Sequence, residues 1–237
     1  MYRLFIPILL LLACLAPLRA ASQSSMWSGL LPQQQRELTL GKPVVIEEVI
    51  AGNPWPRFTV YQVVKSSSAQ AAAVFWDCEL DPKYVPNCLS VKPVAHPSPW
   101  IYEGEYMLKM PMMLPNEVYI TRNVLQAQEV PEVYEISWNV QKARYIKRSN
   151  GNIRIEPLSP NAYSTQGKGE QSLIRYTNLV IPSSSIAGLL QPMARSQVVE
   201  SVKALANQIE NEIKISPELL NQQMEKLTQA LKAIPTG

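Results

Sequence analysis

The sequence predicts a single α+β domain in which a curved antiparallel sheet wraps around one long C-terminal helix. Residues 89–181 repeatedly alternate apolar and polar side chains with the period of two that half-buried strands show. Residues 189–213 then carry apolar side chains at helical spacing along one face. A sheet with one apolar face must cover that face, and this helix is the only predicted element long enough to do so.

The chain begins with the pattern of a cleavable secretory signal. Arg3 precedes an apolar run from Leu4 to Leu15, which ends near Pro17. The run is short for a hydrocarbon core of about 30 Å. We therefore expect residues 1–21 to be removed on export, which makes the mature protein periplasmic or secreted.

Two other interpretations of the N-terminus stay open. The apolar run could remain as an uncleaved anchor. Alternatively, Leu11, Leu12 and Ala13 before Cys14 resemble the motif at which lipoproteins are processed and anchored.

The charge of the mature chain argues against nucleic acid as a partner. Removal of Arg3 and Arg19 leaves 20 of the 22 basic residues against 19 acidic ones, a net charge of +1. No block of basic residues remains to neutralise a phosphate backbone. No later segment is apolar for about 18 residues, so we expect no transmembrane segment in the mature chain, while transient contact with a membrane is left open.

The first part of the mature chain predicts a hairpin followed by helices. Residues 22–40 are polar and predict a flexible lead-in to a domain spanning residues 41–214. Residues 43–50 and 57–65 alternate as strands around a Gly-Asn-Pro turn. Residues 69–80 are rich in alanine and follow three serines that can act as N-caps, which indicates a helix. A second short helical stretch is expected to begin at Asp81.

Further strands follow, and their alternation indicates which side chains face the helix. The turns between them are expected near residues 114–116, 131–132 and 150–152, with strands at 153–158 and 172–181 after the last turn. Arg122 stands in phase with the inward residues of its strand. The other side chains predicted to face inward are Tyr102, Tyr106, Leu108, Met110, Val118, Ile120, Val124, Tyr134, Ile136, Trp138 and Val140.

A second helix is predicted after the long one. Ser216 stands at its N-cap and Pro217 at its first position, and residues 217–232 carry an apolar stripe. Residues 215–237 therefore form a C-terminal helical extension. Whether it covers a cavity or contacts a protein partner is left open.

Two cysteines remain after removal of the signal. Cys78 and Cys88 lie at the ends of neighbouring helical stretches, and an oxidising compartment would allow them to form a disulfide. The alternative is a pair of buried thiols.

The sequence carries no recognisable catalytic motif. It has one histidine, His96, next to a proline in an expected loop, where a surface position is the simplest interpretation. No metal-ligand spacing, phosphate-binding loop or serine-hydrolase elbow is present, so no catalytic residue, metal or cofactor is assigned. Acids and tyrosines could still perform acid–base chemistry.

Eight short stretches, together with the order of the elements, form a recognisable pattern. The stretches are Phe58–Val64, Ala72–Asp77, Tyr84–Asn87, Ile101–Tyr106, Asn116–Arg122, Tyr134–Trp138, Arg175–Asn178 and Val198–Val202. They resemble the START-like or polyketide cyclase superfamily, which includes the birch pollen allergen and has the helix-grip fold. The resemblance covers roughly residues 43–213.

This resemblance implies that the protein binds or transfers a lipid or another hydrophobic molecule in a cavity between the sheet and the long helix. A cyclase-like or lipid-modifying enzyme of the same fold is the alternative, and an interaction module that uses the last helix is a third possibility. The residues expected to contact the ligand are Tyr102, Tyr106, Leu108, Ile120, Arg122, Trp138, Tyr176, Met193, Val198 and Val202.

Two features near this predicted cavity have open interpretations. Arg122 would meet an anionic head group of the ligand, pair with an internal acid or lie in water at the strand end, since a buried arginine needs a partner. Residues 111–115, with two methionines and a leucine between prolines, would form either the lip of the entrance or a turn resting on the sheet edge.

Overall fold

The computed structural model describes residues 26–111, 114–126, 128, 132–158, 170–183 and 187–235. The predicted signal at residues 1–21, with Cys14, lies outside the described residues, as do Met112 and Met113 of the apolar loop. The export predictions are therefore not tested by the fold.

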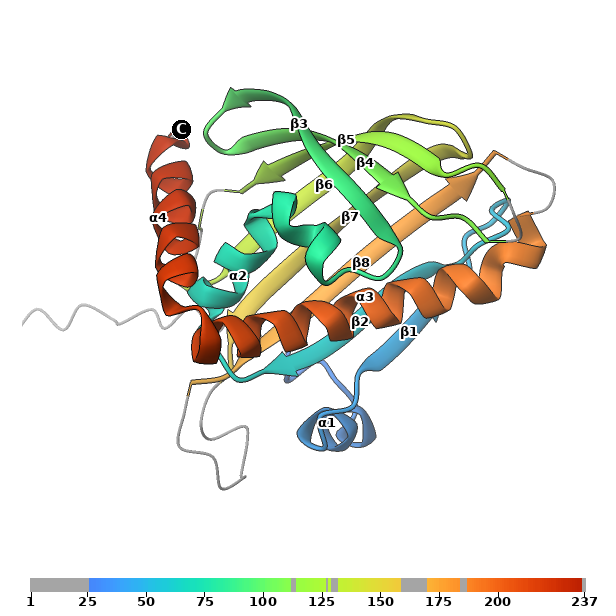
Figure 1. The fold of residues 1–237 in the computed structure, drawn as a ribbon. Helices are drawn as coiled ribbons and strands as arrows, with labels where there is room; N and C mark the ends of the chain where they lie inside the picture. Colours follow the sequence, from blue (N-terminus) through green and yellow to red (C-terminus); the bar gives the residue numbers. More distant parts are fainter. Residues whose placement is uncertain are drawn as a thin grey trace, which may run out of the picture.

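One eight-stranded antiparallel sheet forms the body of the molecule (Figure 1). Its spatial order is β1-β2-β8-β7-β6-β5-β4-β3, so β1 and β3 are the two edges. The strands are β1 (Val44–Glu48), β2 (Arg57–Val64), β3 (Cys88–Ser98), β4 (Ile101–Leu108), β5 (Glu117–Leu125), β6 (Tyr134–Ala143), β7 (Ile146–Pro157) and β8 (Ser172–Pro182).

One face of this sheet, called the inner face below, carries the long helix. Helix α3 (Ala187–Ile215) crosses the inner face along its length (Figure 1). The other helices are α1 (Pro32–Thr39), α2 (Ser68–Trp76), the 3₁₀ helix η1 (Cys78–Lys83) and α4 (Pro217–Ala233). The predicted α+β architecture, a curved sheet around a long helix with an additional C-terminal helix, is confirmed.

Side-chain hydrogen bonds join α3 to residues next to the strand ends at three places along its length. At its start, the Trp55 indole N–H donates to the Ala187 carbonyl oxygen over 2.5 Å. Further along, Asn87 after η1 donates to the Gln197 side chain over 2.5 Å. Near its end, Glu210 accepts from the Lys65 backbone N–H over 3.2 Å. These contacts connect α3 with segments that directly flank β2 and β3.

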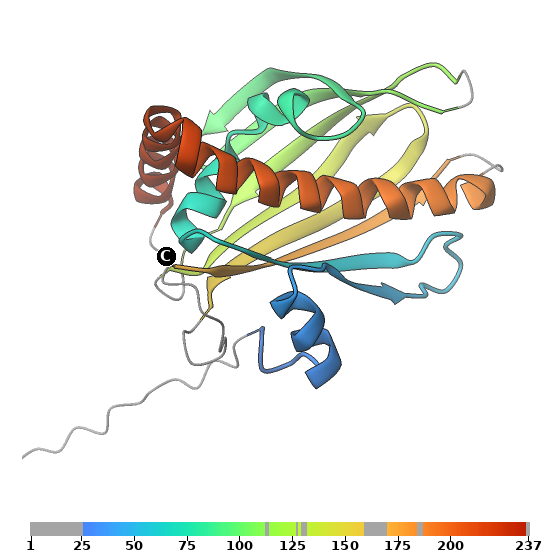
Figure 2. The ribbon, with the colours of Figure 1, turned by 60° about the horizontal axis from the view of Figure 1, so that its bottom comes forward.

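The segment predicted to be a flexible lead-in is ordered from Met26 onward. Helix α1 lies against the outer face of the sheet, opposite α3 (Figure 2). Trp27, Leu30 and Leu38 are buried there against Val63 of β2 and other apolar side chains. The polar composition misled the prediction because three buried anchors are enough to fix a short helix.

The turn predicted at residues 150–152 is wrong. These residues lie inside β7, and the chain turns at Arg144 and Tyr145 instead. Gly151 pairs with Trp138 of β6 and Asn178 of β8, and the indole of Trp138 lies directly over it. The glycine provides room for a close approach in the sheet rather than a bend in the chain.

The inward phase predicted for β5 is also wrong by one residue. Ile120 and Arg122, with Val118 and Val124, lie on the outer face, where Arg122 pairs with Glu103 of β4 over 2.6 Å. The inward side chains are Glu117, Tyr119, Thr121, Asn123 and Leu125. A shift of one residue turns a whole strand over, and both faces of this strand carry apolar side chains, so the sequence pattern was ambiguous.

Helix α4 packs into the core of the domain. Leu220, Leu227 and Ala230 are buried together with the alanines of α2. Asp77, at the end of α2, accepts from Lys226 over 2.9 Å and from Gln223 over 3.4 Å. None of the described helices has the length and apolar character required to cross a bilayer.

The two cysteines are buried, free thiols in the described part of the chain, so the predicted disulfide is not formed and the alternative of two thiols holds. Cys78 and Cys88 pack in one cluster with Tyr102 and Tyr106. Burial raises the pKa of Cys78 above its ordinary range and that of Cys88 to about 12, which keeps both sulfurs protonated near neutral pH.

Candidate functional site

A cavity of about 710 Å³ lies between the inner face and α3. This size falls within the range of about 300–1,000 Å³ that small-molecule sites occupy. The helix side of the cavity is mostly apolar because α3 presents one stripe of its surface to the sheet. The apolar residues of α3 that line it are Ala187, Leu190, Met193, Ala194, Val198, Val202 and Leu205.

Most of the residues predicted to contact a ligand do line this cavity. They come from β4, β6, β8 and α3, which are brought together only by the fold. The predicted residues in the cavity wall are Tyr106, Leu108, Trp138, Tyr176, Met193, Val198 and Val202.

Three predicted residues lie elsewhere. Ile120 and Arg122 are on the outer face, so the Arg122 guanidinium pairs with an acid outside the cavity. Tyr102 is buried beside the cavity rather than in its lining, and its ring packs edge-on against exposed His96 at 5.1 Å. His96 is therefore a surface side chain that covers Tyr102.

Aromatic rings form two ordered parts of the wall. Trp138 packs at 4.9 Å from Tyr176 and at 6.1 Å from Phe75, measured between ring centroids. Tyr106 and Tyr119 stack nearly parallel at 5.2 Å. These contacts fix large side chains around the space instead of letting them fill it.

Several cavity residues were missed because they are polar or lie on the strand whose phase was wrong. Tyr119, Thr121 and Asn123 alternate on β5, and Asn178 lies on β8. The alternation of these polar and aromatic residues is itself a period-two signal. It was hidden because Val118, Ile120 and Val124 form an apolar series in the opposite phase. Glu117 also borders the cavity, and its carboxylate accepts from the backbone N–H groups of the β6–β7 turn at 2.7 and 2.8 Å.

Asp81 is the acid in the cavity wall whose protonation is most altered. Burial raises its pKa to about 7, the hydrogen bond from Tyr84 at 2.8 Å opposes that rise, and the nearby Asp77 adds to it. Burial also raises the pKa values of the cavity phenols Tyr84, Tyr106, Tyr119 and Tyr176, so all of them stay protonated. The described residues include no group of three or more His, Cys, Asp and Glu that could hold a metal ion.

The raised pKa of Asp81 predicts that stability falls as pH rises. The folded protein holds this proton up to about pH 7, whereas an unfolded aspartate loses it near pH 4. The stabilisation is therefore complete below about pH 4 and is lost as pH rises to about 7. The asparagine of Asp81→Asn cannot ionise. We therefore expect this variant to be more stable than the wild type at pH 8, by about 1–3 kcal/mol in the free energy of unfolding. Water in the cavity that solvates the Asp81 carboxylate brings the difference toward the lower value.

Urea unfolding at pH 5 and pH 8 measures this difference. Glu79→Gln is the matched control, because Glu79 is an exposed acid on the same 3₁₀ helix. If Asp81→Asn and the wild type lose the same stability between the two pH values, Asp81 is not a protonated acid in the folded protein.

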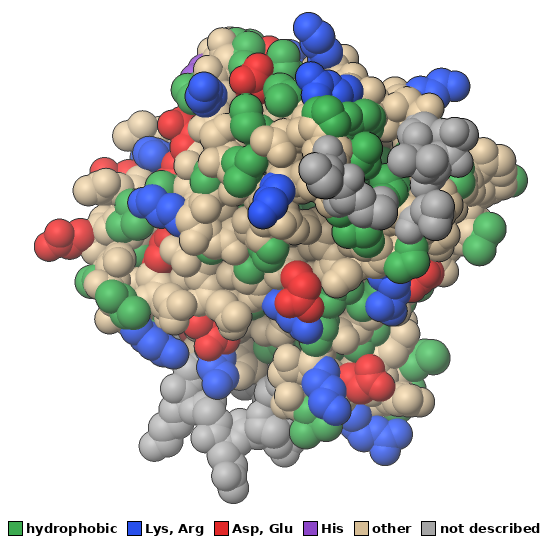
Figure 3. Space-filling model, turned by 45° about the vertical axis from the view of Figure 1, so that its right-hand side comes forward, with side chains coloured by type: hydrophobic (Ala, Val, Ile, Leu, Met, Phe, Trp, Pro, Cys, Tyr) green, Lys and Arg blue, Asp and Glu red, His purple; other side chains and the backbone are tan. Residues whose placement is uncertain are grey.

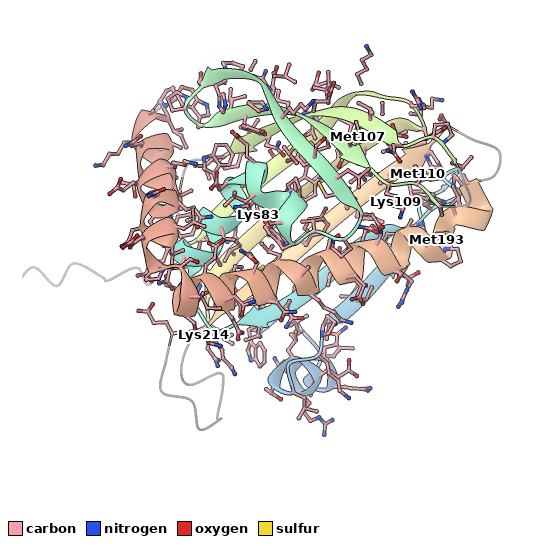
Figure 4. The ribbon with its side chains drawn as sticks, in the orientation of Figure 1. Lys83, Met107, Lys109, Met110, Met193 and Lys214 are labelled. Atoms are coloured by element: carbon pink, nitrogen blue, oxygen red, sulfur yellow. The ribbon has the colours of Figure 1, made fainter. Side chains whose placement is uncertain are left out.

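The rim of the cavity combines methionines with a lysine. Met110, just after β4, and Met193 of α3 lie at one end of the molecule together with Lys109 (Figure 4). Met193 and Lys109 are exposed, and Pro111 and Leu114 continue this part of the lining. On the surface that this end of the molecule presents, Lys and Arg side chains are interspersed with Asp and Glu side chains (Figure 3).

No protein-family model and no curated protein matches the sequence. Solved structures do match the fold. The STAR-related lipid transfer protein from Xanthomonas axonopodis superposes with a TM-score of 0.57 at 12% identity, covering 71% of this chain and 93% of that one.

Two further matches extend the comparison. Human STARD10 gives a TM-score of 0.55 at 17% identity over 76% of this chain and 78% of its own. The Zhui aromatase/cyclase from Streptomyces sp. R1128 gives a TM-score of 0.52 at 10% identity, over 68% of this chain and 96% of its own. Identities this low establish the fold alone. The chain has the helix-grip fold of the START-like and polyketide cyclase superfamily, as its sequence resemblance predicts.

Proposed function

We propose that this protein binds or transfers a lipid or another hydrophobic small molecule outside the cytoplasm. The cavity of about 710 Å³, with apolar side chains of α3 on one side and fixed aromatic rings on the other, carries the proposal. Pockets of this size that are mostly apolar, with few polar groups, are typical of small-molecule sites. The fold shared with a STAR-related lipid transfer protein agrees with this function.

A cyclase-like or lipid-modifying enzyme is the second candidate, and one observation favours it. Asp81 has a pKa of about 7 and borders the cavity beside the hydroxyl of Tyr84, which is the range in which a carboxyl group can serve as a general acid or base. The fold shared with an aromatase/cyclase agrees with it. Turnover of a supplied polyketide or lipid by the purified protein, lost in Asp81→Asn, would favour the enzyme over the carrier.

The binding proposal predicts that filling the cavity abolishes ligand binding. Val198→Trp places an indole into the cavity from α3, where Val198 now lines the wall. We expect native mass spectrometry to find bound hydrophobic molecules in the purified wild type and none in this variant. After delipidation, an apolar fluorescent probe should bind the wild type at least tenfold more tightly than the variant.

The matched control for this experiment is Asn207→Trp, which adds the same side chain at an exposed position of α3 away from the cavity. It should retain the bound molecules and the probe. A delipidated, folded wild type that binds no apolar probe would remove the basis of the proposed function.

Export is the second part of the proposal and rests on residues 1–21. The intact mass of the protein recovered from the periplasm, the medium and the membrane fraction distinguishes the open interpretations. Loss of about the first 21 residues supports a cleaved signal, a lipid-modified chain beginning at Cys14 supports a lipoprotein, and an intact N-terminus supports an anchor.

A further inference from the structure

Two adjacent inward side chains of β5 have polar atoms without a partner. Thr121 and Asn123 are 4% and 6% exposed, and both line the cavity. Among the described residues, the Thr121 hydroxyl oxygen and the Asn123 amide nitrogen have no hydrogen-bond partner. A buried polar atom without a hydrogen-bond partner destabilises a protein, and most buried polar atoms in folded proteins therefore have one.

The neighbouring strands do not supply the missing partners. On β6, Val140 stands opposite Thr121, and Trp138 stands opposite Asn123. Across β4, Gly104 stands opposite Thr121 and has no side chain, while Tyr102 stands opposite Asn123. The Tyr102 ring folds over Gly104, with a ring carbon 2.6 Å from where a Cβ would be. Its hydroxyl is likewise buried and has no partner among the described residues.

We propose that Thr121 and Asn123 hold the uncharged polar group of an amphiphilic ligand whose apolar part lies against α3. This inference rests on the proposed binding function and specifies the class of ligand. An amide N–H donates and a hydroxyl both donates and accepts, so the pair matches a hydroxyl, carbonyl, ester or amide group.

The charges around the cavity argue against an anionic group at this place. The acids in the lining are Asp81, Glu117 and Glu200, and Glu117 is already occupied by two backbone N–H groups. Glu200 is exposed and pairs with Lys203 at 2.9 Å. The cation in the described lining is Lys109, which is exposed at the rim. A buried anion beside Thr121 would therefore lack a cation to offset its desolvation.

Three ten-carbon probes test the inference by displacing an apolar fluorescent dye from the delipidated, full-length mature protein. Decane has no polar group, 1-decanol has a neutral one, and decanoate at pH 8 has an anionic one. The variant Thr121→Val/Asn123→Leu replaces both polar side chains by apolar ones of similar shape. We expect the ratio of decanol affinity to decane affinity to fall roughly five- to tenfold in this variant.

Two controls accompany this measurement. Val118→Thr adds a hydroxyl on the outer face of the same strand and should leave the ratio unchanged. The single variant Thr121→Val repeats the test with a smaller change in case the double variant folds poorly. Because the replaced atoms are unpaired in the empty protein, the double variant should be at least as stable to urea as the wild type.

The outcomes separate this inference from the proposed function. An unchanged ratio, with decane and decanol both bound, leaves an apolar cavity but overturns the anchoring role of Thr121 and Asn123. A loss of stability with an unchanged ratio shows that ordered water satisfies these atoms and also overturns it. Decanoate that binds more tightly than decanol contradicts an uncharged group. A wild type that binds neither the dye nor any probe overturns the proposed function itself.

Discussion

Deletion of residues 216–237 is expected to unfold the protein rather than to remove a separable module. Helix α4 contributes Leu220 and Leu227 to the main core, where they are 5% and 2% exposed. Full burial of a leucine side chain contributes about 1.5–3 kcal/mol. The partly buried Met224, Leu231 and Ile234 pack against the same core. Their sum is a large part of the roughly 5–15 kcal/mol by which domains are stable.

The deletion also leaves a buried carboxylate without its partners. Asp77 is 9% exposed and accepts from both Lys226 and Gln223 of α4. Removal of the partners of a buried charge is strongly destabilising. We therefore expect the shortened protein to show no cooperative urea transition by circular dichroism and to aggregate.

Single substitutions provide the control for this deletion. Leu227→Ala should lower the free energy of unfolding by about 2–5 kcal/mol, whereas Gln229→Ala, on the exposed side of the same helix, should leave it nearly unchanged. A shortened protein with the urea midpoint of the full chain would instead show that α4 is a separable appendage that does not stabilise the domain.

The fold could be predicted because its strongest signals are long and periodic. The long helix was expected at residues 189–213 and spans Ala187–Ile215, and the last helix was expected at 217–232 and spans Pro217–Ala233. On β4 and β6, apolar residues occupy the inner face and mostly polar residues the outer face, so the inward phase was correct.

The cavity was predicted less well because a ligand site does not follow the pattern of a core. On β5, polar Thr121 and Asn123 face inward while Val118 and Ile120 face outward, the reverse of what burial alone favours. Sequence alternation assigns apolar residues to the inside, and it fails where the inside is a polar wall. The error on this strand therefore coincides with the place where the proposed site has its polar groups.

Gly151→Ala is expected to distort the sheet, because the position has no room for a methyl group. A Cβ there would overlap the Thr177 carbonyl oxygen of β8 and the indole of Trp138. The carbonyl belongs to the backbone of a paired strand and cannot turn away, so β7 and β8 would have to separate locally. We expect a loss of about 1–3 kcal/mol or more in the free energy of unfolding, measured in urea.

The same substitution at Gly188 is the matched control. No atom lies within 4 Å of a Cβ at Gly188, which is exposed near the start of α3, and alanine favours a helix there by up to about 1 kcal/mol. Gly151→Ala should also move the indole of Trp138, which lines the cavity, and thus change the emission of a bound apolar probe, whereas Gly188→Ala should not. If the two variants were equally stable, Trp138 and β8 would not lie as close to Gly151 as the fold requires.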